Sequence, residues 1–146
     1  MPEPWAIRLI NESGARLLLD ERDLWPDETF PTTVVIVRTE FLNRYPDLVD
    51  QWLRAHLRVT RWVREHPDEA KTIVRDEIKA LTGATISDEV IAQSFMRMEV
   101  VDDPMTEAVK QSADHAYALG FLGDAPPDLT SLVDVKPLER ARASAG

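Results

Sequence analysis

The feature that most constrains the fold is a run of six successive β-branched residues, Thr32–Val37. Branching at Cβ favours extended backbone, and continuous apolarity is typical of a strand buried on both faces. We therefore expect residues 32–38 to form a strand. A shorter apolar segment at residues 16–20 predicts a second strand, because charges bound it at both ends and it is too short for a helix.

After residue 38 the apolar period changes from two to about 3.6, which predicts helices. Pro67 and Gly83 stand where a helix favours proline at its start and glycine just past its end. The sequence predicts an α+β, mainly helical fold with one or two short strands followed by about five helices, and loop from Gly120 onward. The helical segments are expected at residues 5–12, 39–44, 46–65, 67–82, 88–98 and 104–119.

Residues 46–65 form the longest expected helix, and apolar side chains at helical spacing predict its buried stripe. The other face carries three arginines, which either bind an anion or pair within the helix with Asp50 and Glu65; pairing is the simpler interpretation. The stripe consists of Leu48, Val49, Trp52, Leu53, His56, Val59 and Val63, and the arginines are Arg54, Arg58 and Arg61.

Charge and motif content exclude several classes of function. A net charge of −9 argues against nucleic-acid and anionic-membrane partners. The chain has no cysteine, its three histidines lie far apart, and it lacks the common nucleotide-binding, hydrolase and metalloprotease motifs. We therefore expect no catalytic residue, no metal site and no cofactor. No apolar run is long enough to cross a bilayer, and Met1 does not open a signal peptide.

One segment has the character of a binding corner. Trp5 stands between a proline-stiffened entry, residues 2–4, and the start of an expected helix. Free N–H groups, the positive end of a helix dipole and an aromatic wall suit a small anion or polar ligand.

The chain also resembles a known family over nearly its whole length. It is similar to the C-terminal part of the solute-binding proteins of ABC importers for nitrate, sulfonates and taurine, especially the aliphatic-sulfonate type. The matching segments, in order, are residues 2–6, 14–20, 32–42, 46–49, 53–57, 62–63, 66–70 and 103–104.

That resemblance implies a two-lobed periplasmic-binding-protein fold that closes on its ligand. Residues 1–31 would end the second lobe, residues 32–38 would cross between lobes, residues 39–123 would complete the first lobe, and residues 124–146 would form a tail. The implied partners are a small organic or inorganic anion and an ABC permease, in an extracytoplasmic location. The expected ligand contacts are Glu3, Pro4, Trp5, Thr32 and Thr33.

Two alternatives remain open. Without neighbouring strands, residues 34–37 would present an open apolar edge, which invites self-association or a rearranged, mostly helical fold. The chain would then be a stand-alone helical interaction module, and a homo-oligomer. The third possibility is an enzyme, because pyrimidine-precursor synthases of thiamine biosynthesis resemble the same fold.

Overall fold

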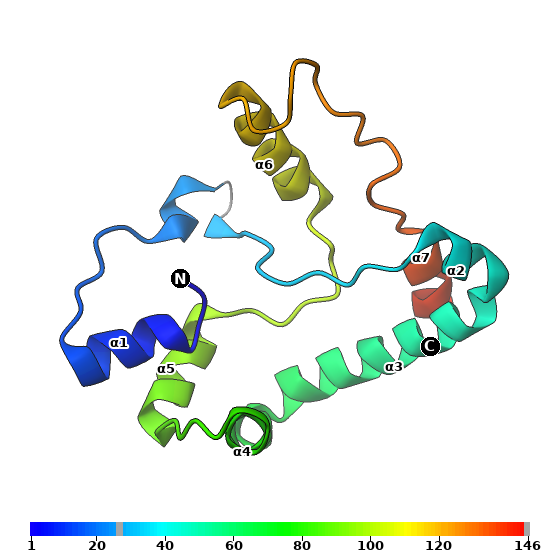
Figure 1. Cartoon of the computed structure of the whole chain (residues 1–146). Helices are drawn as coiled ribbons and strands as arrows, with labels where there is room; N and C mark the ends of the chain where they lie inside the picture. The colour runs from blue at the N-terminus through cyan, green and yellow to red at the C-terminus, as the bar shows by residue number, and fades with distance from the viewer. Residues whose placement is uncertain (26–27, 145–146) are drawn as a thin grey trace. The chain divides into compact units, whose positions relative to one another are not determined.

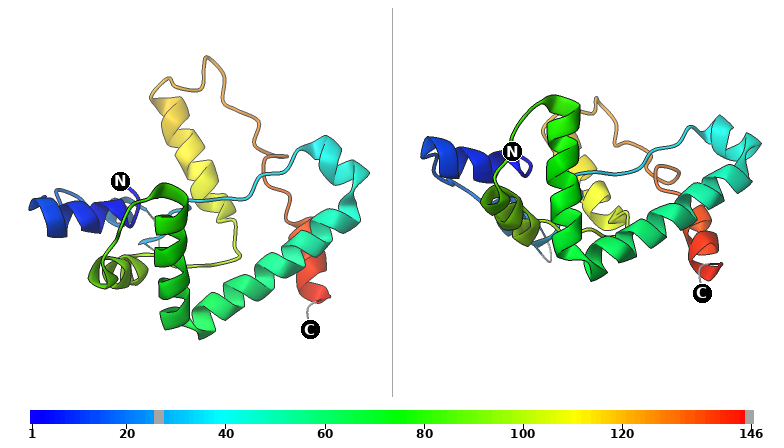
Figure 2. Two further views of the ribbon diagram at one scale, coloured as in Figure 1. Left: turned by 60° about the horizontal axis from the view of Figure 1, so that its bottom comes forward. Right: turned by 90° about the horizontal axis from the view of Figure 1, so that it is seen from below.

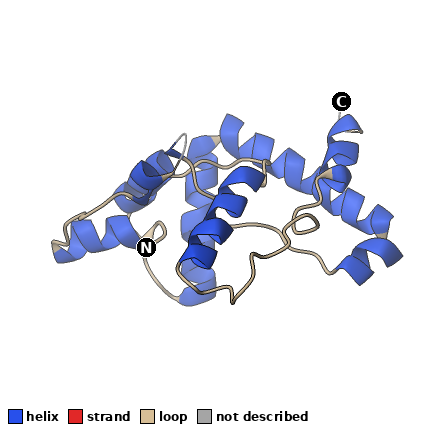
Figure 3. Ribbon diagram, turned by 90° about the horizontal axis from the view of Figure 1, so that it is seen from above, coloured by secondary structure: helices blue, strands red, loops and turns tan. Residues whose placement is uncertain are grey.

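The computed structural model describes residues 1–25 and 28–144, so residues 26–27 of the segment expected to end the second lobe, and residues 145–146 of the expected tail, lie outside the described part. Over these ranges the chain forms seven α-helices, one 3₁₀ helix and no strand (Figure 3). In order, the elements are α1 (Trp5–Ser13), η1 (Glu21–Leu24), α2 (Thr39–Arg44), α3 (Pro46–Glu65), α4 (Pro67–Thr82), α5 (Asp88–Arg97), α6 (Thr106–Ala118) and α7 (Lys136–Ala143) (Figure 1).

Local sequence signals set most helix boundaries. The expected limits of α2, α3 and α4 are confirmed, and those of α1, α5 and α6 differ by one or two residues. Pro67 opens α4, and Gly83 closes it in a left-handed conformation with φ of 75°. At the start of α5, the Ser87 hydroxyl accepts a hydrogen bond from the N–H of Val90 at 3.2 Å. None of the described helices is long and apolar enough to span a membrane.

The chain divides into two compact units. The first consists of residues 1–18 and 57–102. Its core is a small apolar cluster in which α1 and α4 both pack on α5 (Figure 2). The buried members of the cluster are Ile7, Ile86, Val90 and Ile91, with Ile10, Ile78 and Phe95 packed around them.

The second unit contains residues 19–56 and the chain from Asp103 onward. Its most buried residues on α7 are Leu138, 9% exposed, and Ala141, fully buried. The α7 helix is a correction, because the sequence predicted loop there. Its start is marked by Asp134, whose carboxylate accepts the Lys136 N–H at 3.1 Å, and by a proline in the first turn.

The expected strands are wrong. Residues 16–20 and 32–38 form no strand, and none of the backbone groups of residues 32–37 makes a hydrogen bond within the described part of the chain. A strand requires a neighbour that completes its hydrogen-bond ladder, and the described part of this chain provides none. The predicted α+β class is therefore corrected to an all-helical fold over the described residues. The apolar side chains of the second segment stay exposed, by 51% at Val34, 58% at Val35, 89% at Ile36 and 45% at Val37.

The predicted stripe of α3 is only partly buried. Val49 is 9% exposed, but Trp52 and Val59 are about half exposed, at 48% and 59%. The pairing expected for Asp50 is also wrong, because its carboxylate accepts hydrogen bonds from Arg140 of α7 at 3.0 and 3.2 Å. The amphipathic spacing thus predicted the helix, but it did not predict which parts of the chain cover the apolar face of that helix.

Candidate functional site

The candidate site begins at the first turn of α1. Glu3 lies just before this helix, and its carboxylate makes two contacts inside the first unit. Oε2 accepts the backbone N–H of Ile7 at 3.1 Å, and Oε1 accepts the Nε–H of Arg97 at 2.8 Å. The Glu3 side chain is 8% exposed. This carboxylate therefore lies at the positive end of the α1 dipole, where an anion is favoured.

The corner expected to receive a ligand is therefore largely filled from within. The Ala6 N–H reaches the Pro2 carbonyl oxygen at 3.4 Å, while Glu3 takes the Ile7 N–H. Pro4, the N-cap residue, offers no side-chain hydrogen bond. Glu3 positions the start of α1, and the open face of this turn is the side that carries Trp5.

Trp5 and Arg8 form that open face. The Trp5 side chain is 39% exposed, and the guanidinium carbon of Arg8 lies 5.7 Å from the centre of its indole ring. Arg8 also donates from Nε to Glu12 at 2.8 Å. Sequence reasoning missed Arg8, although its spacing of three from Trp5 is the signal for a shared helix face. An aromatic surface beside a guanidinium can contact an alkyl group and an anionic oxygen together.

Thr32 and Thr33 belong to the second unit. Both are exposed, and neither hydroxyl makes a hydrogen bond to any described residue. The structure thus brings Glu3, Pro4 and Trp5 together on one turn of the first unit, and Thr32 and Thr33 follow each other in the second unit.

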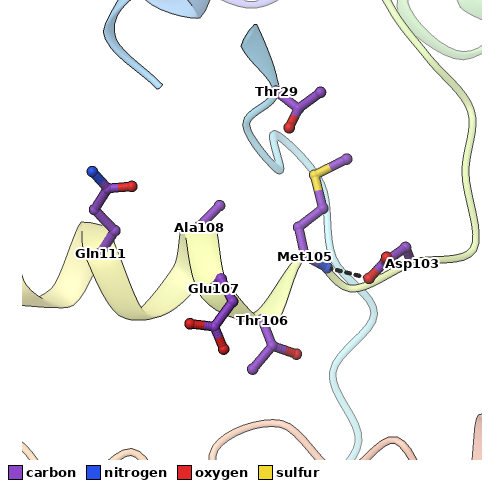
Figure 4. A pocket seen from close by; sticks show the side chains of 7 residues that line it. All are labelled: Thr29, Asp103, Met105, Thr106, Glu107, Ala108 and Gln111. Atoms are coloured by element: carbon purple, nitrogen blue, oxygen red, sulfur yellow. Dashed lines mark hydrogen bonds between the residues drawn. The ribbon is translucent and has the colours of Figure 1, made fainter. Parts of the chain in front are cut away.

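A depression of about 380 Å³ lies at the start of α6 in the second unit (Figure 4). Met105 precedes this helix with φ of 51°, and its N–H donates to Asp103 at 2.8 Å. Two carboxylates in the lining, from Asp103 and Glu107, make the depression unsuitable for an anion. Its other lining residues are Thr29, Met105, Thr106, Ala108 and Gln111.

Each of the three histidines lies beside an aromatic ring. His56 stacks on Trp52 and His66 on Trp62, each with ring centres 5.2 Å apart. His115 lies 5.8 Å from Trp25, which also packs on Phe30 as a loop anchor. His66 joins α3 to α4, with Nδ1 3.1 Å from the Trp62 carbonyl oxygen. Among the described residues, no group of three side chains could hold a metal ion.

Comparisons with known proteins agree with the resemblance. A protein of Bacillus subtilis (strain 168), named "Putative aliphatic sulfonates-binding protein", is 24% identical to this chain over 139 residues. The alignment covers 95% of this chain, and the chain spans 40% of that relative's length. No solved structure matches the chain. The distant relationship to a sulfonate-binding protein is thereby confirmed.

The family is established by a second match. The family model covers residues 1–76 of the 146, from the candidate corner at Trp5 through α3 and into α4. More than half of the sequence therefore follows one family pattern, and the chain belongs to the NMT1-like family.

Proposed function

We propose that this chain is the C-terminal portion of a solute-binding component of an ABC importer for small anions of the sulfonate, nitrate or taurine kind. The alignment of 95% of the chain with a relative named for binding aliphatic sulfonates carries the proposal. Because the chain spans 40% of that relative, the permease partner and the extracytoplasmic location belong to the proposal as well. In this function the chain is a binding protein and not an enzyme.

The proposed contacts in the first unit follow from chemistry. The exposed Trp5 ring contacts the alkyl part of a sulfonate, and the Arg8 guanidinium donates to its oxygens. Pro4 borders the ring as the preceding residue. Glu3 acts indirectly: its carboxylate would repel an anion, so it contributes by holding the first turn against Arg97.

The proposed contacts in the second unit are Thr32 and Thr33. Their exposed hydroxyls can donate to an anionic oxygen without breaking any existing hydrogen bond. Each set of contacts can be tested separately, because the two sets lie on different units.

Isothermal titration of the whole chain with ethanesulfonate, taurine, nitrate and sulfate tests the proposal. We expect binding of at least one anion, reduced roughly tenfold or more by Trp5→Ala, the cost of about 1.4 kcal/mol. Arg8→Gln should weaken binding as well. Trp52→Ala is the matched control, because Trp52 is similarly exposed at 48% and lies outside the proposed contacts.

Two results would contradict the proposal. The first is the absence of heat with all four anions from a chain whose circular dichroism shows the expected helices. The second is equal loss of affinity in Trp5→Ala and Trp52→Ala, which would assign the effect to general destabilisation.

One observation favours a second function, an interaction module. The backbone of residues 32–37 has no hydrogen-bonding partner among the described residues, and its four apolar side chains are about half exposed or more. Such a segment is suited to bind another polypeptide by strand addition. A folded chain that binds no anion but associates through this segment would favour the module.

A further inference from the structure

Residues 32–37 offer a binding partner two kinds of contact, backbone hydrogen bonds and exposed apolar side chains. Its backbone N–H and C=O groups form no hydrogen bond to other described residues, and its apolar side chains face solvent. Exposed strand-forming segments pair with other chains unless charges, prolines or covering elements prevent it. Pro31 borders one end, but nothing interrupts residues 32–37 themselves.

The charge pattern indicates the kind of partner. The chain carries a net charge of −9, so two copies repel each other overall. Residues 29–37 are nine successive positions without an acidic or basic side chain. Two copies can approach there without placing like charges opposite each other, which would destabilise a strand pair.

The segment is also complementary to itself. In an antiparallel pair centred on Val35, that residue faces its own copy. Val34 then faces Ile36 of the second copy, and Thr33 faces Val37. Every one of these cross-strand pairs joins two β-branched residues, the combination that pleated sheets favour.

We propose that residues 32–37 form a β-strand in a dimer of this chain, by antiparallel pairing with the same segment of a second copy. The second copy provides the neighbouring strand that the described residues of one chain do not, and Val35 lies on the two-fold axis. Such a strand pair is small compared with the about 1,200–2,000 Å² of standard interfaces. The dimer is therefore weak, and its population rises with protein concentration. This inference does not rest on the proposed anion binding, because no anion is needed for the pairing.

Light scattering of the purified chain over a range of concentrations tests the dimer. The mass should rise from 16.6 kDa toward twice that value as the concentration increases. Val35→Lys should keep the chain monomeric, because two lysines would face each other at the centre of the pair. Leu132→Lys is the matched control and should leave the dimer intact, because Leu132 is 59% exposed against 58% for Val35 and lies in the same unit.

Disulfide trapping tests the register. The chain has no cysteine, so each variant carries a single thiol. Under mild oxidation Val35→Cys should cross-link at least several times faster than Leu132→Cys, because facing residues of paired strands lie within disulfide distance. Ile36→Cys should cross-link more slowly than Val35→Cys, because Ile36 faces Val34 and not itself.

Several results would overturn the proposal. They are a chain that stays monomeric at all concentrations, a dimer that persists in Val35→Lys, equal cross-linking at Val35 and Leu132, or growth beyond the dimer into larger assemblies. A monomer would point to a partner other than a second copy. Helix content by circular dichroism should be the same in all variants, because Val35 forms no hydrogen bond to any described residue and its side chain is 58% exposed.

Discussion

The carboxylate of Glu3 and the guanidinium of Arg97 lie 2.8 Å apart across 94 positions of sequence, and the Glu3 side chain is almost completely buried. This ion pair joins Glu3, two positions before α1, to the last residue of α5, while the same carboxylate accepts the Ile7 N–H. The ion pair therefore connects the start of α1 to the end of α5 within the first unit.

Glu3→Gln should therefore destabilise the first unit. The substitution removes the charge that accepts both hydrogen bonds, and we expect a loss of about 1–3 kcal/mol in the free energy of unfolding, measured with urea. Arg38→Gln is the control, because Arg38 and its partner Glu40 are both more than 80% exposed. An exposed pair of this kind changes stability by less than about 0.5 kcal/mol. Equal effects of the two substitutions would contradict the importance of burial.

Substituting alanine for one buried and one exposed isoleucine should have very different effects on the free energy of unfolding. Ile91 is 3% exposed within the first unit, and Ile36 is 89% exposed. Ile91→Ala should cost about 2–5 kcal/mol because it leaves a cavity, whereas Ile36→Ala should be nearly neutral in dilute solution. Urea unfolding at low protein concentration measures both. A large loss from Ile36→Ala would mean that the segment is covered even in the monomer.

The contact between Asp50 and Arg140 should hold α7 on α3. These residues lie 90 positions apart, and the hydrogen bond from Arg140 to Asp50 raises the pKa of that guanidinium above its ordinary value. Arg140→Asp should speed amide hydrogen exchange in α7, because it places two acids against each other. The double exchange Asp50→Arg with Arg140→Asp should restore slow exchange. Failure of that rescue would mean that other contacts hold α7.

The turn at Asp128 should respond to acid. The hydroxyl and N–H of Thr130 donate to this carboxylate at 2.7 and 3.0 Å, which holds the pKa of Asp128 below its ordinary value of 3.8. A lowered pKa means that the turn is stabilised above pH 3.8 and loses this contribution as the pH falls through the lowered value. Thr130→Val removes the stronger donor, so the pKa should rise toward 3.8 in an NMR titration. Thr85→Val, on a threonine remote in sequence, should leave it unchanged.

The helices could be predicted from sequence because their signals are local. Pro46, Pro67 and Gly83 mark boundaries within α3 and α4 through backbone chemistry that acts over a few residues. The pairs that organise each unit could not be predicted, since Glu3–Arg97 and Asp50–Arg140 join positions about 90 residues apart.

The strand prediction was wrong for a related reason. Six successive β-branched residues favour extended backbone, but a β-strand forms only where another strand completes its hydrogen bonds. Within the candidate site, Trp5 and the first turn of α1 could be identified from sequence, and Arg8 could have been. The filling of the corner by Glu3 could not, because it depends on Arg97 from the far end of the first unit.

The division into two units has a consequence for how the protein is made. The chain passes between the units three times, so neither unit is one continuous stretch of sequence. During synthesis from the N-terminus, the first unit has all its residues once Asp102 has left the ribosome. Residues 19–56 must wait for the rest of their unit, which begins only at Asp103. The apolar segment 32–37 lies in this waiting stretch and stays exposed after its unit is complete, so it is open to other chains both during synthesis and afterwards.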